Sequence, residues 1–259
     1  MEIDRKYLIA GNWKMYKTAG EGVVLVKDIA QLVEDVWDEV EVVICPPFTG
    51  LKSVSTLIEL DKLTIGLGAQ DCHWESEGAF TGEVAPRMLT ELRVGHVIIG
   101  HSERREYFGE TDESVNKKVK VVLANRMTPI MCCGESLAVH EAGETESFVR
   151  KQVTAGLAGL SAEEASKLVV AYEPIWSIGT GHTPLPEKAN DVARTMRATI
   201  GAMYGPPAAV QARILYGGSM KPENARMFMA EPDIDGGLIG GAALVAESFS
   251  DIVHAASDK

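Results

Sequence analysis

The sequence has no long hydrophobic run and few cysteines. No apolar stretch approaches the roughly 18 residues that a membrane-spanning helix needs, and residues 1–6 lack the apolar stretch of a secretory signal. The four cysteines (Cys45, Cys72, Cys132 and Cys133) show no metal-ligand spacing and are too few for a disulfide framework. We therefore expect a cytoplasmic protein with reduced thiols, no metal ion and no membrane partner.

Positive charge is scarce as well. The chain has 25 Lys and Arg against 37 Asp and Glu, which gives a net charge of −12. A protein that binds nucleic acid usually presents a basic face, so we expect no nucleic-acid partner. If the substrate is an anion, its site must be local, formed by backbone N–H groups, helix N-termini and one or two lysines.

The chain also lacks a linker, a low-complexity segment or a charge block that would separate two domains. Its 259 residues could form two small domains or one barrel, because α/β barrels often contain about 250 residues. Hydrophobic residues make up 46% of the chain, which is enough to fill a large core. We predict a single domain over residues 1–259.

Short apolar runs alternate with segments of helical periodicity. Runs such as Val97–Ile99 lack polar alternation, which is typical of strands covered on both faces. Between them, residues Leu25 to Val36 show the spacing of one apolar helix face, and Pro186 and Pro222 stand where helices could begin. The strand-like runs are Tyr7–Ala10, Val40–Cys45, Leu63–Ala69, His96–Gly100, Pro129–Cys133, Leu168–Tyr172, Arg213–Tyr216 and Leu238–Ile239.

Eight such runs alternating with helices predict an α/β fold in which a parallel sheet closes into a (βα)₈ barrel. A doubly wound open sheet is the structural alternative. Such a sheet normally has a glycine-rich fingerprint after its first strand. Here the first strand ends in Gly11-Asn12-Trp13-Lys14, which does not match that fingerprint.

Polar residues collect where the predicted strands end. In a (βα)₈ barrel the catalytic groups lie on the loops after the carboxyl ends of the strands, so residues distant in sequence converge at one mouth. These positions hold Asn12 and Lys14, then His101, Ser102 and Glu103, then Glu173, and finally Gly217-Gly218-Ser219 and Gly240-Gly241.

Each of these residues has a structural interpretation beside a functional one. A carboxylate at the end of a buried strand is costly unless it is paired or used, so Glu173 is either a catalytic base or half of an ion pair, for example with Lys14. Lys14 could be an ordinary surface lysine, and Asn12 a turn residue. His101 could be a structural hydrogen-bonding group. It precedes a predicted helix, whose N-terminus disfavours imidazolium.

Three loops are also candidates. The segment from Pro174 to Gly181 contains glycines and follows Glu173, so it is either a lid or an ordinary connection. The glycine pairs after the seventh and eighth strands suggest a phosphate site. The loop Gly78–Gly82 exposes Phe80, which indicates a partner contact unless the loop folds onto its own barrel.

Four segments resemble the motifs of the triosephosphate isomerase family, in that family's order, within a region from Tyr7 to about Val253. They are Gly11-Asn12-Trp13-Lys14-Met15, Gly100-His101-Ser102-Glu103-Arg104-Arg105, Ala171-Tyr172-Glu173-Pro174-Ile175-Trp176 and Tyr216-Gly217-Gly218-Ser219. The resemblance implies a TIM barrel and an aldose–ketose isomerase. Such an enzyme interconverts dihydroxyacetone phosphate and D-glyceraldehyde 3-phosphate, in glycolysis and gluconeogenesis, without a cofactor.

The resemblance also implies roles for individual residues. Glu173 matches the catalytic base of the family and His101 its electrophile, whereas Asn12 and Lys14 match residues that hold and polarise the substrate. Glu103 matches a carboxylate of the family that supports these residues without contacting the substrate. The phosphate-binding backbone matches Gly179, Ser219, Gly240 and Gly241. The lid matches Pro174, Ile175, Trp176, Ser177, Ile178, Gly179, Thr180 and Gly181.

The family resemblance further implies a homodimer, with Gln70, Phe80 and Thr81 at the interface and Thr81 reaching the partner's site. The sequence departs from the family pattern in two places. Cys133 stands where Ile or Val is more common, and His182-Thr183-Pro184 stands where Lys-Thr-Ala is common. The second departure lies at the C-terminal end of the lid and could affect lid motion.

Two other functions can be weighed against the isomerase. A Schiff-base aldolase on the same barrel needs a lysine inside the mouth. The sixth strand ends in Glu173 instead, and Lys167 precedes that strand. A barrel that only binds or scaffolds would not require Lys14, His101 and Glu173 together.

Overall fold

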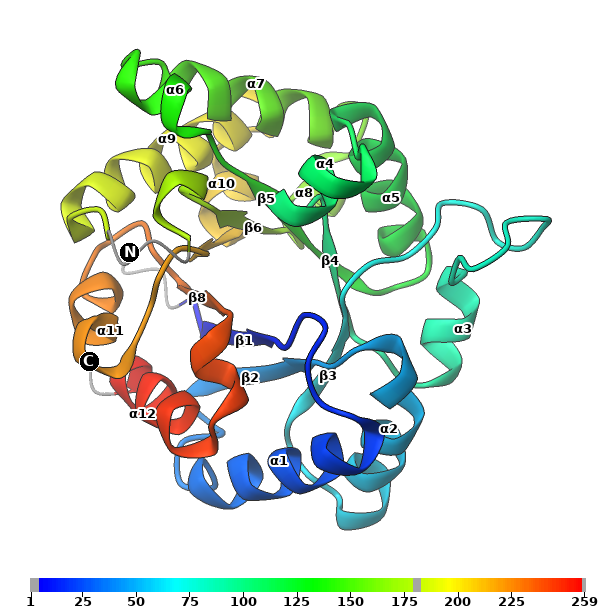
Figure 1. Cartoon of the computed structure of the whole chain (residues 1–259). Coiled ribbons are helices and arrows are strands. Elements are labelled where there is room, and N and C mark those ends of the chain that lie inside the picture. The colour runs from blue at the N-terminus through cyan, green and yellow to red at the C-terminus, as the bar shows by residue number, and fades with distance from the viewer. Residues whose placement is uncertain (1–4, 179–182, 258–259) are drawn as a thin grey trace.

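The computed structural model describes residues 5–178 and 183–257. The predicted lid residues Gly179, Thr180 and Gly181 lie outside the described residues. Eight parallel strands form a closed barrel in chain order, and β1 pairs with β8 through Ile9 opposite Gly237. The (βα)₈ prediction is therefore confirmed (Figure 1).

The strands are short and lie close to the predicted runs. They are β1 (Tyr7–Asn12), β2 (Val40–Cys45), β3 (Gly66–Ala69), β4 (His96–Ile99), β5 (Thr128–Cys133), β6 (Val169–Tyr172), β7 (Arg213–Tyr216) and β8 (Gly236–Ile239). The third strand begins three residues later than expected. Lys62 adopts a left-handed conformation (φ 52°) at the end of the preceding helix, and Leu63 N–H donates to the carbonyl of Ile58. This turn uses the residues that the apolar pattern had assigned to the strand.

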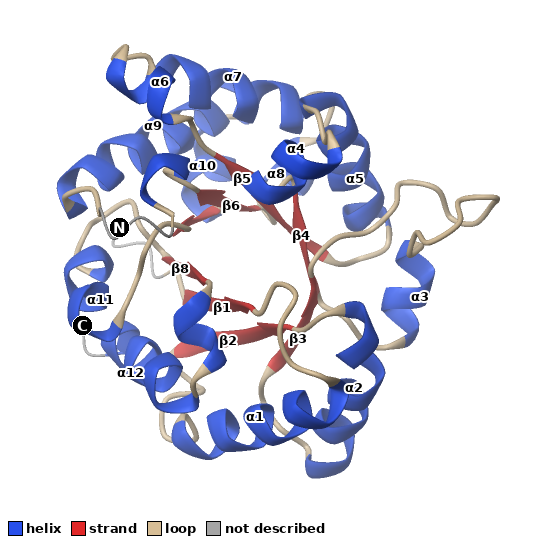
Figure 2. Cartoon of the chain, in the orientation of Figure 1, coloured by secondary structure: helices blue, strands red, loops and turns tan. Residues whose placement is uncertain are grey.

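Helices surround the barrel (Figure 2). They are α1 (Ala19–Leu32), α2 (Phe48–Asp61), α3 (Pro86–Glu91), α4 (Ser102–Phe108), α5 (Asp112–Ala124), α6 (Leu137–Glu141), α7 (Thr145–Leu157), α8 (Ala162–Ala165), α9 (Pro186–Tyr204), α10 (Pro206–Gln211), α11 (Pro222–Met229) and α12 (Ala246–Ser257). Two 3₁₀ turns, η1 (Ile175–Ser177) and η2 (Gly241–Leu244), lie on the loops after β6 and β8. No helix in the described ranges is long and apolar enough to cross a membrane.

The helix boundaries follow local chemistry. The Thr18 hydroxyl accepts from Glu21 N–H at the start of α1, and the Glu21 carboxylate accepts from Thr18 N–H, so each satisfies a free backbone donor. Pro186 and Pro222 begin α9 and α11, as expected. The periodic pattern wrongly extended the first helix to Val36. The helix ends at Leu32, although Val33 and Val36 are still buried.

The core has two parts. Side chains that point into the barrel form a plug that includes Leu8, Ala10, Val43, Ile98 and Leu238. Side chains that point outward from the strands, such as Ile9, pack against the helices in a second and larger cluster. This alternation explains the continuous apolar runs, because both faces of every strand are covered. All four cysteines are free and buried.

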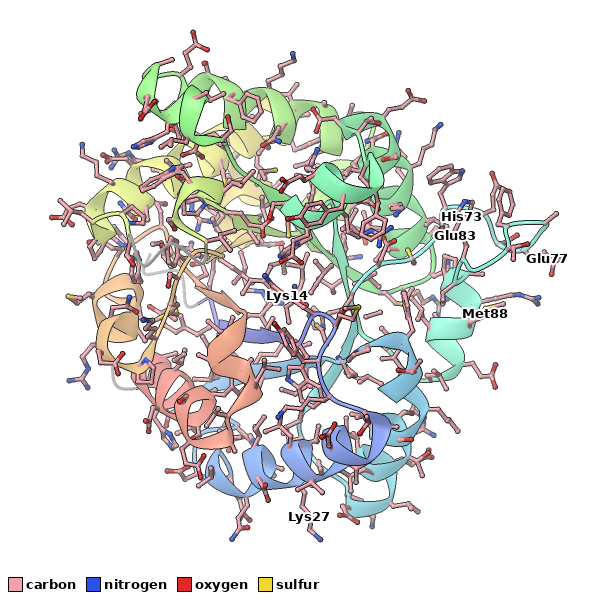
Figure 3. All side chains as sticks on the ribbon, viewed as in Figure 1. Lys14, Lys27, His73, Glu77, Glu83 and Met88 are labelled. Carbon is pink, nitrogen blue, oxygen red and sulfur yellow. The ribbon has the colours of Figure 1, made fainter. Side chains whose placement is uncertain are left out.

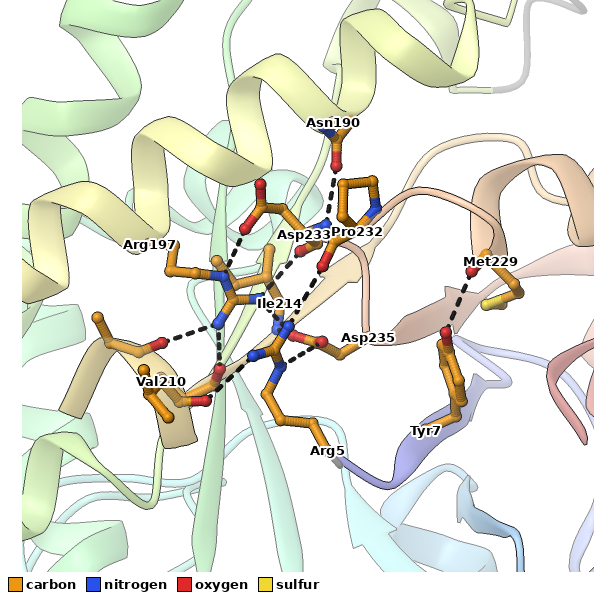
Figure 4. A network of polar contacts seen from close by, with 12 residues as sticks. Arg5, Tyr7, Asn190, Arg197, Val210, Ile214, Met229, Pro232, Asp233 and Asp235 are labelled. Carbon is orange, nitrogen blue, oxygen red and sulfur yellow. Dashed lines mark hydrogen bonds and ion pairs between the residues drawn. The ribbon is translucent and has the colours of Figure 1, made fainter. Parts of the chain in front are cut away.

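A polar network joins the beginning of the chain to α9 and to the connection between β7 and β8 (Figure 4). The Asp235 carboxylate accepts from Arg197 Nη2 at 2.6 Å and from Ile214 N–H at 2.8 Å, and it also pairs with Arg5. Arg197 Nε lies 2.8 Å from Asp233 Oδ1. The network anchors the two strands that carry the glycine-rich turns of the candidate site.

Candidate active site

A cavity of about 540 Å³ opens at the carboxyl ends of the strands. Several predicted site residues line it, although they come from different strands: Asn12, Lys14, His101, Ile178, Gly217, Gly218, Ser219, Gly240 and Gly241. Figure 3 places Lys14 near the centre of the ring of strands. The predicted convergence at one barrel mouth is thus observed.

Glu173 follows β6 and is 2% exposed. Its Oε2 accepts from Ser102 N–H at 2.9 Å, and its Oε1 accepts from Ser102 Oγ at 3.2 Å. His101 Nε2 lies 2.9 Å from the same Oε1. Burial alone would raise the pKa of Glu173, but His101, the Ser102 N–H and Lys14 together lower it. The arrangement therefore holds an ionised carboxylate surrounded by donors.

His101 caps the N-terminus of α4, as its position before a helix predicted. Its Nδ1 accepts from Glu103 N–H at 3.2 Å, so the neutral ring carries its proton on Nε2, facing Glu173. Burial lowers the pKa of His101, but the adjacent Glu173 carboxylate raises it by more. A lowered pKa was expected for His101, but its pKa is raised while Glu173 stays in this position.

Lys14 forms its ion pair with Glu103, whose Oε1 lies 2.6 Å from Lys14 Nζ. The pairing with Glu173 that we considered is therefore wrong. The Lys14 backbone adopts the left-handed region (φ 51°), which is uncommon for a residue with a side chain. Asn12 Oδ1 accepts from Lys14 N–H at 3.0 Å, so Asn12 also supports the turn. Gln70 Nε2 donates to the carbonyl of Lys14 at 2.8 Å.

The turn after β7 requires glycine because neighbouring atoms leave no room for a side chain. A Cβ at Gly218 would lie 2.2 Å from the Tyr216 hydroxyl oxygen, and one at Gly217 would lie 3.0 Å from Glu173 Cγ. The turn thus packs closely against the carboxylate. Ser219, Gly240 and Gly241 line the same cavity, where backbone N–H groups could bind an anion.

The predicted lid begins in η1, directly after Glu173 and Pro174. Trp176 Nε1 donates to Glu135 Oε1 at 2.7 Å, and the Tyr172 hydroxyl donates to the same oxygen at 3.1 Å. The His140 ring stacks on Trp176 with a centroid separation of 4.2 Å. Glu135 is fully buried, and this burial raises its pKa. These contacts anchor the N-terminal end of the segment.

A family model described as "Triosephosphate isomerase" matches residues 7–256. The chain belongs to the triosephosphate isomerase family. A protein named triosephosphate isomerase from Clostridium perfringens (strain SM101 / Type A) is 51% identical over 250 residues, which are 96% of this chain and 99% of that protein. One from Caldanaerobacter subterraneus subsp. tengcongensis is 51% identical with the same coverage. Another from Trichlorobacter lovleyi is 49% identical over 96% of this chain and 98% of that protein.

This membership confirms the resemblance seen in the four motifs. Two residues that contact motif positions had no predicted role: Ser102, which was expected at the mouth, and Glu135, which was not predicted at all. Ser102 donates two hydrogen bonds to Glu173, and its place as the first residue of the helix after His101 indicated a backbone N–H free for such a bond. Glu135 follows the end of β5 by two residues. The rule that led to Glu173 would have found Glu135 if it had been applied to the fifth strand.

The loop after β3 extends away from the barrel, where Figure 3 labels Glu77 and Glu83. Phe80 is 43% exposed, and its ring lies 4.3 Å from the ring of His73 between centroids. Thr81 is exposed. The loop is therefore partly folded onto its own base but still presents apolar surface. Gln70, in contrast, is bound to the Lys14 turn.

Metal-binding side chains are not clustered in the described parts of the chain. Within residues 5–178 and 183–257, no group of three or more His, Cys, Asp or Glu side chains could hold a metal ion. The ionisable groups at the mouth contact one another instead, in the pairs His101–Glu173 and Lys14–Glu103. The mouth therefore holds two carboxylates, a histidine and a lysine in two contacting pairs.

Proposed function

We propose that the chain interconverts dihydroxyacetone phosphate and D-glyceraldehyde 3-phosphate by proton transfer through an enediolate, in glycolysis and gluconeogenesis. One observation carries the assignment of roles. A buried carboxylate, Glu173, lies 2.9 Å from a histidine ring nitrogen at a cavity that Lys14 and Asn12 also line. The family supports the reaction, and this cluster supports the choice of residues. We further propose that the whole chain, residues 1–259, forms one domain.

Glu173 acts as the base that removes a carbon-bound proton from the substrate. The enediolate that results carries negative charge on oxygen. The Nε2–H group of His101, the Asn12 amide and the Lys14 ammonium surround these oxygens and stabilise the charge where it develops. The hydroxyl proton passes from one of these oxygens to the other through His101 Nε2, and Glu173 then returns the carbon-bound proton to the neighbouring carbon. Glu103 holds Lys14 in place through their 2.6 Å ion pair.

The carboxylate must move before it can react, because its oxygens are occupied by Ser102 and His101. When Glu173 turns toward the substrate, it gives up these hydrogen bonds. The pKa of His101 then falls, because the Glu173 carboxylate is the main group that raises it. Burial and the helix N-terminus both favour the neutral ring. Movement of the base therefore prepares the histidine to donate as a neutral imidazole.

The phosphate group of the substrate is bound by backbone N–H groups of Gly179, Ser219, Gly240 and Gly241. The lining of the cavity by the last three supports this assignment. Uncharged backbone donors suit an acidic protein, because they bind an anion at short range without additional cations. Binding energy from this remote group then supports catalysis as well as affinity.

The segment Pro174–Gly181 closes over the bound substrate. An enediolate phosphate exposed to water can lose its phosphate, so the site must exclude water during the reaction. Trp176 is fixed to Glu135 at one end of the lid. At the other end, Pro184 has a restricted φ and biases Thr183 toward extended conformations. We expect this hinge to be stiffer than the common Lys-Thr-Ala would make it.

We also propose a cytoplasmic homodimer. The protruding loop Gly78–Gly82 would insert into the neighbouring subunit, with Phe80 supplying apolar contact area and Thr81 reaching the partner's site. Gln70 would serve the interface indirectly, because it binds the turn that carries Lys14. The 43% exposure of Phe80 supports this placement.

A coupled assay of triose phosphate isomerisation tests the proposal. We expect rapid turnover of D-glyceraldehyde 3-phosphate, competition by inorganic phosphate or sulfate, and very poor turnover of unphosphorylated glyceraldehyde. Similar kcat/KM values with and without the phosphate group would contradict the proposal. Covalent trapping by borohydride in the presence of substrate would instead indicate a Schiff-base aldolase.

A further inference from the structure

The charges at the cavity pose a problem for an anionic substrate. The whole chain carries a net charge of −12, and the inner site is not positive either. Lys14 is paired with Glu103 at 2.6 Å, and Glu173 adds a second carboxylate. Two carboxylates thus face one lysine and one histidine, so the inner site has no excess of positive charge. The backbone N–H donors of the proposed phosphate site act at short range, so long-range attraction of a phosphate dianion must come from another group.

Among the described residues that line the cavity, Lys221 is the other lysine. It lines the cavity between Met220 and Pro222, immediately before α11, and its side chain is exposed. Its backbone N–H donates to Asn224 Oδ1 at 2.8 Å, which fixes the residue at the helix N-terminus. Within the described residues, the Lys221 ammonium forms no ion pair, in contrast to Lys14.

We propose that Lys221 is a steering residue, which attracts the phosphate group of the substrate to the mouth of the cavity. This inference rests on the proposed function. The residue lies two positions after Ser219, which we place in the phosphate site. An unpaired charge at the rim of a cavity concentrates an oppositely charged ligand there and raises its rate of association. Glu223 lines the same cavity and should act in the opposite direction.

The expected size of the effect follows from the charges. A lysine about 10 Å from a dianion in water changes the local concentration of that dianion about three- to four-fold when salt is low. The screening length falls from about 30 Å at 0.01 M ionic strength to about 3 Å at 1 M, so salt should remove the effect. A contact in the bound complex would not be screened in this way.

The experiment compares kcat/KM for D-glyceraldehyde 3-phosphate at about 0.01 M and about 0.5 M ionic strength. The variants are Lys221→Gln, Lys221→Glu and Glu223→Gln. Matched controls are Lys27→Gln and Lys27→Glu, which change the net charge equally. Lys27 is exposed on α1 and lies at the edge of the molecule, far from Lys14 (Figure 3). Lys221→Arg should retain the wild-type value because it keeps the charge.

At low salt we expect kcat/KM to fall about three-fold in Lys221→Gln and about ten-fold in Lys221→Glu, and to rise in Glu223→Gln. These differences should be carried by KM and should disappear at high salt. Three outcomes would overturn the proposal: equal losses in the Lys27 controls, no loss in the Lys221 variants, or a loss that persists undiminished at high salt.

A second measurement separates this proposal from the proposed function. The affinity for inorganic phosphate is measured directly by calorimetry, in wild type and in Lys221→Gln, at both ionic strengths. Weaker binding in Lys221→Gln at low salt alone would support the steering role even if the protein showed no isomerase activity. Equal phosphate affinity in the two proteins would overturn it, whatever reaction the chain catalyses.

Discussion

His96 makes the stability of the fold depend on pH in a way that can be calculated. It begins β4, is 8% exposed, and has its Nε2 3.3 Å from Glu41 Oε1. Burial lowers the pKa of His96 from 6.5 to about 4, which outweighs the opposing effect of Glu41. Arg213, which pairs with Glu41, lowers this pKa further. The folded protein therefore keeps this ring neutral under mildly acidic conditions.

The direction and size of the change in the free energy of unfolding follow from proton linkage. Between pH 6.5 and about 4 the unfolded chain binds a proton that the folded chain does not, so the free energy of unfolding falls as the pH falls. At about 1.4 kcal/mol per unit of pKa, the full loss approaches about 3 kcal/mol. About 2 kcal/mol of it is already lost at pH 5. Well above pH 6.5 the contribution is constant, because the ring is neutral in both states.

Urea unfolding of wild type, His96→Gln and His96→Phe at about pH 7.5 and about pH 5 tests this reasoning. One protein concentration should be used throughout, because a dimer unfolds in a concentration-dependent way. Both variants should lose about 2 kcal/mol less than wild type between the two pH values, although they pack differently. The reasoning is refuted if all three proteins lose the same amount.

Three further predictions concern the network, the base and the dimer. Asp235→Asn should lower the free energy of unfolding by about 3–5 kcal/mol, because it leaves buried guanidinium groups uncompensated. Asp233→Asn should cost less, since Asp233 is more exposed, and equal losses in urea unfolding would contradict this. Gly134→Ala should lower kcat about 10²-fold in steady-state assays, because its Cβ would lie 1.7 Å from the Glu173 carbonyl oxygen; unchanged kcat would exclude that clash. Replacing residues 78–82 with a short Gly/Ser turn should give monomers of low activity in sedimentation and assay, and fully active monomers would argue against the proposed interface.

The strands were predictable because a closed parallel barrel buries both faces of each one. The runs Val40–Cys45 and Arg213–Tyr216 match β2 and β7 at both ends. The prediction was poorer where backbone geometry decides the boundary. The eighth strand begins at Gly236, whose φ of 142° and close approach to Leu8 require glycine. An apolar pattern does not detect such residues, so only Leu238–Ile239 was expected.

The positions of the candidate site were predictable from topology, but its contacts were not. Strand ends predicted that Asn12, Lys14, His101 and Glu173 would meet at one mouth, and all four lie there. Whether Lys14 pairs with Glu103 or with Glu173 depends on the directions of the side chains. Lys14 and Glu103 are 89 residues apart in the sequence, so no local pattern indicates that they pair. The left-handed backbone of Lys14 helps to set the direction of its side chain, and no residue pattern indicated it. The hydrogen bonds that Ser102 and Glu135 form also depend on side-chain directions, so the sequence did not predict them.

The most direct test of the central claim is the kcat of Glu173→Gln for D-glyceraldehyde 3-phosphate. The amide keeps the shape of the carboxylate but cannot accept the proton. We predict that kcat falls by about 10³-fold or more with a much smaller change in KM, while the circular dichroism spectrum stays that of the wild type. A folded Glu173→Gln protein that retains the wild-type kcat would show that Glu173 is not the base.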